Sequence, residues 1–199
     1  MGISAQDVKA LRDKTGCGMM DCKEALTACD GDQEKAIDHL RKKGIAKAGR
    51  RTGRATSEGA IGSYVHAGGK IGVLVELACE TDFVAQNAEF QSLLKELCMQ
   101  VAAAAPIAAR REELPADVLE REKAIYREQV ANKPANVIDK IVEGKMRSFY
   151  QEACLLEQPW IRDPKKAVQE LISEHIAKLG ENIVVQRFVR FQLGEDRAE

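Results

Sequence analysis

The chain has 199 residues, with 30 Lys and Arg against 31 Asp and Glu, and its formal net charge is -1. Hydrophobic residues make up 45% and charged residues 31%, so there is enough apolar material for a core and wholesale disorder is excluded. This length accommodates one ordinary domain, or a small domain joined to a larger one. The near-zero net charge argues against binding nucleic acid through the whole surface.

The composition predicts a cytoplasmic protein. The most apolar stretch, residues 98–109, contains a Gln and a Pro and is far shorter than the ~20 residues that span a membrane. The N-terminal residues lack the basic and apolar regions of a signal peptide. The cysteines do not show the Cys-x2-Cys spacing of a zinc site and the histidines are scattered, so we expect free thiols, no metal and no cofactor.

Residues 1–45 predict a domain of three short helices. Ser4 is a good N-cap with Asp7 three residues later, as in a capping box. Asp32 caps the third helix, which we expect to end at Gly44. The apolar residues with the spacing of a shared core are Val8, Leu11, Met20, Ala25, Leu26, Ala36, Ile37 and Leu40. We expect a small bundle, ubiquitin-associated-like in architecture, that presents a helical face to a partner.

A basic stretch follows, and we predict a flexible linker over residues 46–58. The cations between residues 41 and 54 have no acidic residue among them and are Arg41, Lys42, Lys43, Lys47, Arg50, Arg51 and Arg54. An RNA-binding patch is the alternative interpretation of these residues. We favour the linker because no aromatic residue is interleaved to stack on bases.

Residues 59–199 predict an α+β core domain. Residues 60–67 and 70–80 are rich in Val, Ile and Tyr and are separated by Gly68-Gly69, a two-residue hairpin signal. A last strand is expected over residues 182–193, where Val, Phe and Leu alternate with Arg and Gln. The sheet is therefore expected to be antiparallel with about three strands, and helices should cover one face of it.

The remaining apolar periodicity of this domain is helical. Pro115 and Pro134 each suit the first turn of a helix, and the two helices read as a hairpin over residues 115–150. Asp163-Pro164 is expected to open a further helix, which Gly180 closes.

No catalytic motif stands out. The phosphate-binding Gly-x4-Gly-Lys-Ser/Thr pattern, Gly-x-Ser-x-Gly and His-Glu-x-x-His are all missing, so we do not expect an enzyme. His66 lies alone at a strand end, and an isolated His is more often structural than catalytic. Glu80 and Asp82 could bind Mg²⁺, but such residues more often cap the helix that follows.

The sequence Thr81-Asp82-Phe83-Val84 is unusual because an apolar strand runs into a turn with an acid and a large aromatic residue. Residue types alone favour a structural role, with Thr81 capping a helix and Phe83 filling the core, because Phe is usually buried. The alternative is that Asp82 and Phe83 project into a partner as an acidic, aromatic wedge.

Residues 8–26, Val-Lys-Ala-Leu-Arg-Asp-Lys-Thr-Gly-Cys-Gly-Met-Met-Asp-Cys-Lys-Glu-Ala-Leu, closely resemble the N-terminal domain of bacterial translation elongation factor Ts. The turn Thr81-Asp82-Phe83-Val84-Ala85 resembles the core signature of that family. Further matches follow in the family's order and span nearly the whole chain: Gly62-Ser63-Tyr64 with His66, residues 142–146, Gln158-Pro159, and residues 188–191 with Gly194-Glu195. Each match is modest alone, and jointly they are highly specific.

The resemblance implies a guanine-nucleotide exchange factor for the GTPase elongation factor Tu, and no bond-making chemistry. It implies that the N-terminal helices dock on the GTPase, at the positions matched by Arg12, Met19 and Met20. It assigns displacement of Mg²⁺ to the turn of Thr81, Asp82, Phe83 and Val84, and it makes His66 a weaker contact candidate.

Shorter members of this family have one core unit, and this chain has room for only one. They act as homodimers, so the resemblance implies a homodimer in a 2:2 complex. The second half of the chain, including residues 185–193, is the candidate dimer surface. Neither a membrane nor a specific nucleic acid is expected as a partner. The alternatives are an RNA- or ribosome-binding module that uses residues 41–54, and an adaptor that binds proteins through Met19 and Met20 and needs only the first 44 residues. A metal-dependent hydrolase is a more remote alternative.

Overall fold

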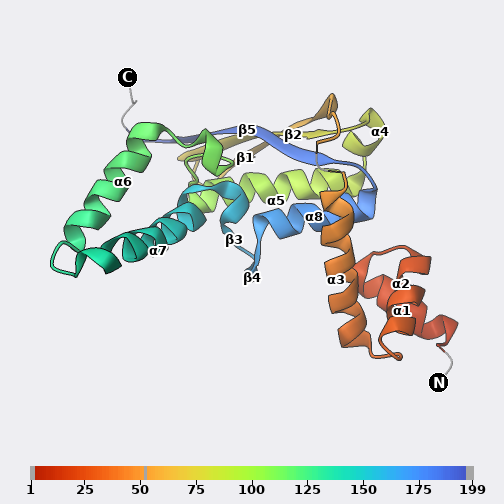
Figure 1. The fold of residues 1–199 in the computed structure, drawn as a ribbon. Coiled ribbons are helices and arrows are strands. Elements are labelled where there is room, and N and C mark those ends of the chain that lie inside the picture. Colours follow the sequence, from red (N-terminus) through yellow and green to blue (C-terminus); the bar gives the residue numbers. More distant parts are fainter. Residues whose placement is uncertain (1–2, 52, 196–199) are drawn as a thin grey trace. The chain divides into compact units, whose positions relative to one another are not determined.

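The computed structural model describes residues 3–51 and 53–195 (Figure 1). The three-stranded antiparallel sheet has the order β1-β2-β5, and β3 and β4 form a separate two-stranded sheet. This arrangement confirms the predicted α+β class. No helix in the described residues is both long and apolar enough to cross a membrane. The elements are α1 (Ala5–Thr15), α2 (Met19–Ala28), α3 (Gln33–Gly49), β1 (Glu58–Val65), β2 (Ile71–Cys79), α4 (Asp82–Ala85), α5 (Ala88–Ala104), η1 (Arg111–Glu113), α6 (Ala116–Gln129), α7 (Ala135–Ala153), η2 (Leu155–Glu157), β3 (Pro159–Trp160), β4 (Asp163–Ala167), α8 (Val168–Leu179) and β5 (Ile183–Gln192).

The chain divides into two compact units, each assembled from separate stretches of the sequence. Unit 1 comprises Met1–Gly59, Ala78–Leu93 and Glu170–Val184. Unit 2 comprises Ala60–Leu77, Leu94–Gln169 and Val185–Glu199. Because both units are discontinuous, they do not test boundaries drawn along the chain, and the predicted domains 1–45, 46–58 and 59–199 stay a prediction.

Helices α1, α2 and α3 pack together in unit 1. The predicted capping box is confirmed, since the Ser4 hydroxyl accepts from the Asp7 amide at 3.2 Å and the Asp7 carboxylate accepts from the Ser4 amide at 3.1 Å. The prediction of a core position was wrong for Met20, which is 66% exposed. Cys22 is buried instead, because it lies three and four residues before Ala25 and Leu26 and so shares their helix face.

Helix α3 continues through Gly44, where the third helix was expected to end, and stops at Gly49. A glycine inside a helix costs only about 1 kcal/mol, which packing can offset. A Cβ on Gly44 would lie 3.4 Å from the Cβ of Ala177 in α8, so the glycine permits a close approach within unit 1. The first residues of the predicted linker are therefore helical, and Thr52 lies outside the described residues.

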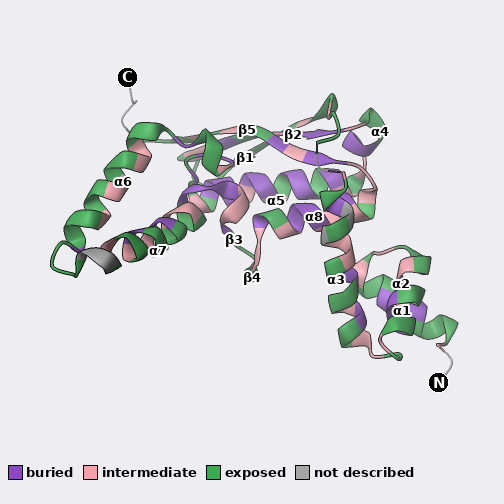
Figure 2. Cartoon of the chain, in the orientation of Figure 1, coloured by how far each residue is buried: buried purple, intermediate pink, exposed green. Residues whose placement is uncertain are grey.

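In unit 2, α5 covers one face of the sheet. A Cβ on Gly62 of β1 would lie 2.5 Å from Cγ of Leu94 and 3.0 Å from Sγ of Cys98, so only glycine allows this spacing. Val73 and Val75 of β2 are buried as well. Figure 2 shows that α5, which runs along the sheet, also carries buried residues. The expectation that helices cover one face of the sheet is met by this contact.

The other face of the sheet carries apolar side chains that are exposed in the described part of unit 2. The predicted alternation in β5 is present, but Val189, Phe191 and Leu193 point away from α5, and Phe191 is 67% exposed. The Arg190 side chain faces inward, where its Nε donates to the Ala102 carbonyl at 3.4 Å and its Nη1 lies 2.8 Å from Glu195.

The predicted helical hairpin is confirmed as α6 and α7, but the helix expected at Asp163-Pro164 was wrong. Residues Asp163–Ala167 form β4, which pairs with β3, and helix α8 begins only at Val168. A buried amide network explains the difference. The Gln100 side chain donates to Gln158 at 3.0 Å and accepts from the Ile161 amide at 2.9 Å, which holds this chain segment extended.

All six cysteines are free thiols, and four of them are buried. Burial is the main cause that raises the pKa of Cys98 to about 11. It likewise raises the pKa of Cys154 to about 11. These two thiols are therefore protonated and unreactive near neutral pH.

Candidate functional site

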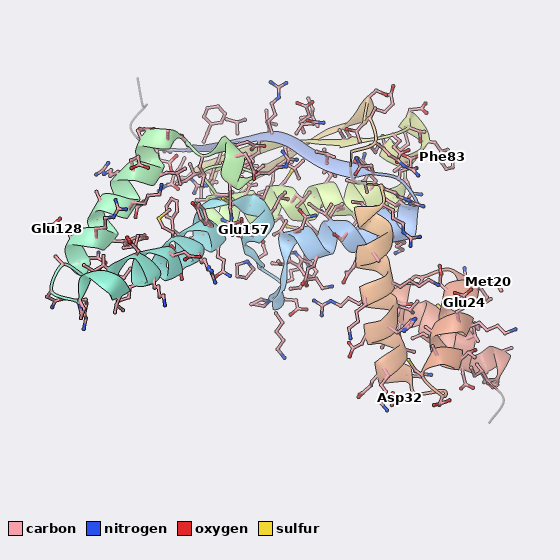
Figure 3. All side chains as sticks on the ribbon, in the orientation of Figure 1. Met20, Glu24, Asp32, Phe83, Glu128 and Glu157 are labelled. Carbon is pink, nitrogen blue, oxygen red and sulfur yellow. The ribbon has the colours of Figure 1, made fainter. Side chains whose placement is uncertain are left out.

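The turn that follows β2 exposes one aromatic ring on a well-anchored backbone. Thr81 is the N-cap of α4, and its hydroxyl accepts from the Val84 amide at 3.4 Å, as predicted. Val84 and Ala85 are buried and anchor one side of this short helix. Asp82 is exposed, and Phe83 is 79% exposed, with its ring directed away from the ribbon (Figure 3). The burial that residue type favoured for Phe83 was therefore wrong.

A second anchor of this turn comes from far along the sequence. The Glu181 carboxylate accepts from the amides of Glu80 and Thr81 at 3.1 and 3.0 Å, and from the Thr81 hydroxyl at 2.7 Å. Glu181 lies between α8 and β5 and belongs to unit 1 with the turn. No local motif connects position 181 with position 81, so the sequence alone does not identify Glu181 as part of the site.

The N-terminal candidates lie on the surface of the helical bundle. Arg12 is an exposed residue of α1, and Met19 and Met20 open α2, where both are exposed. Gly18 is the N-cap of α2 and provides no side-chain hydrogen bond, so the first turn of α2 presents backbone amides and the two methionines. Exposed methionines form an adaptable apolar contact surface.

Unit 1 brings these N-terminal residues and the Thr81–Val84 turn into one compact body. Contacts to α8 connect its parts: Arg41 of α3 pairs with Glu170, and Arg51 donates to the Ile176 carbonyl at 3.1 Å. Lys178 of α8 also pairs at 2.7 Å with Glu89 of α5.

His66 belongs to unit 2 and is not brought together with the other candidates by unit 1. It directly follows β1, where its amide donates to the Ile71 carbonyl at 2.9 Å across the hairpin. Its Nδ1 lies 3.1 Å from the Tyr64 hydroxyl. His66 is exposed, so it is accessible to a partner while it also supports the hairpin end.

Several cations of the basic segment 41–54 are occupied by partners within unit 1. Lys43 lies 3.0 Å from Asp21 and also pairs with Glu24, and these carboxylates, Glu24 first, raise the pKa of the Lys43 amine. Arg54 lies 3.5 Å from Glu80. Cations that are already paired with carboxylates are less available to neutralise phosphates, which weakens the RNA-binding alternative.

The described residues contain no group of three or more His, Cys, Asp or Glu side chains placed to hold a metal ion. The arrangement at the Thr81–Val84 turn is instead an exposed ring beside an exposed acid, on a backbone that is anchored from two sides. The turn thus presents an aromatic surface and a carboxylate to solvent at the same point.

Comparison with known proteins gives a match over almost the whole chain. The family model described as "Elongation factor TS" matches residues 13–195. The elongation factor Ts of Caldanaerobacter subterraneus subsp. tengcongensis is 60% identical over 195 residues, which are 97% of this chain and 98% of the relative. The elongation factor Ts of Geobacter metallireducens is 57% identical over 201 residues, which cover 100% of this chain and 93% of the relative.

Proposed function

The chain belongs to the elongation factor Ts family, and on that premise we propose that it is a guanine-nucleotide exchange factor for the GTPase elongation factor Tu. It would accelerate GDP release during translation elongation, in the cytoplasm. An exchange factor of this kind forms and breaks no covalent bond, so it would not be an enzyme in the usual sense.

The exposure of Phe83 carries this proposal. A large aromatic ring that is 79% exposed on an anchored turn gains nothing for the fold by its position, since burial would be the favourable state for the ring. Such a ring provides an anchor for a pocket on a partner, where aromatic residues contribute much of the binding energy. Asp82, next to it, adds a negative charge at the same point.

The physical basis of exchange is thermodynamic linkage. GDP is held in a GTPase by phosphate contacts and by Mg²⁺. A partner that binds the nucleotide-free state better must weaken nucleotide binding by the same factor. Each ~1.4 kcal/mol of coupling lowers nucleotide affinity tenfold. In our proposal Phe83 supplies the differential contact beside the Mg²⁺ site, and Asp82 repels phosphate or competes for its donors.

The other candidate residues have supporting roles in this proposal. Arg12, Met19 and Met20 would dock the factor on the GTPase domain and so set the concentration at which it acts. His66 would be a secondary contact. Because docking and displacement use different residues, substitutions in the two groups should change different kinetic parameters.

We also propose a homodimer that forms a 2:2 complex with the GTPase. The support is the outer face of the sheet, where exposed apolar side chains lie on all three strands. They are Ile61, Val65, Leu74, Val189 and Phe191, and exposed Leu193 directly follows β5. Several exposed apolar side chains on one face of a sheet are typical of an interaction site.

The test is release of a fluorescent GDP analogue from elongation factor Tu, measured at increasing concentrations of the factor. Wild type should accelerate release. Phe83→Ala should lower the limiting rate by about thirtyfold, the equivalent of losing an interface anchor of about 2 kcal/mol. Met20→Ala should mainly raise the half-saturating concentration.

Ile107→Ala is the matched control, since Ile107 is an exposed apolar residue outside the proposed surfaces and its variant should behave as wild type. No acceleration by wild type would contradict the exchange function. Binding of RNA that weakens steeply with salt would then support the alternative role of residues 41–54.

A further inference from the structure

We propose that Glu181 is a positioning residue for nucleotide exchange, whose carboxylate holds the Thr81–Val84 turn in the conformation that presents Phe83. This role rests on the proposed function. It goes beyond the motif itself, since Glu181 lies 100 residues from Thr81 in the sequence.

The contacts of Glu181 determine how the turn is closed. The Thr81 hydroxyl donates its single proton to Oε1 of Glu181 at 2.7 Å. A hydroxyl has one proton and two lone pairs, so this donation leaves the lone pairs free to accept from the Val84 amide, at 3.4 Å. The other oxygen of Glu181 accepts from the amides of Glu80 and Thr81. One carboxylate thus fixes the backbone before α4 and orients the hydroxyl that caps it.

The neighbouring residues form a second set of bonds in the opposite direction. The Glu80 carboxylate accepts from the backbone amide of Asn182 at 2.7 Å. The side-chain amide of Asn182 donates to the Arg54 carbonyl at 2.9 Å. Asn182 is buried. The pair Glu80-Thr81 and the pair Glu181-Asn182 therefore exchange hydrogen bonds both ways, and the end of β2 is fixed to the start of β5 within unit 1.

The turn needs this external support. Helix α4 has only four residues, and a helix of one turn has no stability of its own. The Phe83 ring is exposed and makes too few contacts to fix its own direction. Its direction follows from the backbone, which Val84 and Ala85 anchor on the buried side and Glu181 anchors at the N-cap. Without Glu181, the turn would have to be ordered during docking, and this cost would reduce the effect of Phe83 on GDP release.

The test uses the same GDP-release titration. Glu181→Ala should lower the limiting rate about tenfold, the loss expected when hydrogen bonds to a charged group are removed, and should change the half-saturating concentration little. Glu181→Gln keeps one acceptor oxygen and should restore part of the rate. Glu89→Gln is the matched control, because it removes the nearby ion pair with Lys178 and leaves the bonds of Glu181 in place, so its limiting rate should be that of wild type.

A second measurement separates positioning from general stability. In Glu181→Ala, hydrogen exchange of the Glu80 and Thr81 amides should become faster, while the buried amides of β2 keep their protection. Phe83→Ala combined with Glu181→Ala should be no slower than Phe83→Ala alone, because Glu181 acts only through the turn. If Glu181→Ala is unfolded, Glu181→Gln takes its place in both measurements.

The outcomes distinguish the two proposals. A wild-type chain that does not accelerate GDP release overturns the exchange function, and this role with it. An active wild type together with a fully active Glu181→Ala overturns only the positioning role. The positioning role is also overturned if the double variant slows GDP release by the product of the two single-variant effects.

Discussion

The turn at Thr81–Val84 and the outer face of the sheet both expose apolar surface, but they do so in different ways. The turn, in unit 1, presents a single ring on four residues of helix. The sheet face, in unit 2, spreads its apolar side chains over three strands. A single anchor suits a partner that must bind and leave within one reaction cycle, whereas a broad apolar face suits lasting association.

The two surfaces also differ in what supports them. Hydrogen bonds to a carboxylate hold the turn, through Glu181 and Thr81. Close packing holds the sheet face, because α5 approaches β1 at Gly62 and contacts it through Leu94. Substitutions that remove hydrogen bonds should therefore affect mainly the turn. Substitutions that change side-chain volume should affect mainly the sheet.

The largest effect is expected from a charge on the sheet face. Phe191→Lys should dissociate the proposed homodimer, because a symmetric interface contains the substitution twice and each copy costs about 2 kcal/mol, or about 4 kcal/mol in total. Light scattering should show a molecular mass reduced by half, while Phe83→Ala keeps the mass of wild type. A wild-type chain that is monomeric at working concentration would contradict the assignment of the sheet face.

A smaller effect is expected from added volume behind the sheet. Gly62→Ala places a methyl group 2.5 Å from Leu94 Cγ, so β1 or α5 must shift. Overpacking of this kind costs about 1–3 kcal/mol. Denaturant unfolding measures this loss, and Gly72→Ala is the matched control, since a Cβ at Gly72 of β2 meets nothing within 4 Å. Equal free energies of unfolding for the two variants would show that α5 is not closely packed against β1 at Gly62.

The buried thiol of Cys98 lies in the layer between α5 and the sheet, so its reactivity should depend on the packing of that layer. The pKa of Cys98 is raised to about 11 by burial, so its folded state stays protonated at pH values where the unfolded chain has lost the proton. The Cys98 thiol therefore contributes to the free energy of unfolding at pH values below its pKa in the unfolded chain. This contribution is lost as the pH rises from about 9 to 11.

In alkylation at about pH 8, the partly exposed Cys17 and Cys29 should react first, and Cys98 and Cys154 only after opening of unit 2. Peptide mass spectrometry identifies the modified residue. Rapid labelling of Cys98 in the native chain would show that the layer behind the sheet is loose.

The smallest effect is expected from acid at the helix caps of unit 1. Bonds from Ser4 lower the pKa of Asp7, and the Lys35 amide lowers that of Asp32. A lowered folded pKa gives stability that is present above the unfolded pKa and is lost as pH falls through the folded pKa, which here lies below the ordinary pKa of an Asp carboxyl. Helicity of wild type should decline in that range, and Asp32→Ala should show a smaller decline. An identical acid transition would exclude the cap as its cause.

Features that depend on neighbouring residues were predicted correctly from the sequence. The capping box at Ser4 and Asp7, the cap at Thr81 and the hairpin around Gly68-Gly69 each depend on residues a few positions apart. Predictions were wrong where a distant contact overrode the local preference. Gly44 does not end α3 because α8 packs against it, and Asp163 begins a strand because buried amides hold the neighbouring segment.

The sequence by itself determined the family, the helices of the N-terminal bundle and the motif that contains Phe83. Alternation in β5 also identified which residues share a face, since side chains of a strand alternate between faces. Only the tertiary structure decided that the Val189 and Phe191 face is uncovered, that Phe83 is exposed, and that Glu181 reaches Thr81. The physical reason is that periodicity shows which side chains lie together, whereas burial and long-range hydrogen bonds depend on which other segment packs against them.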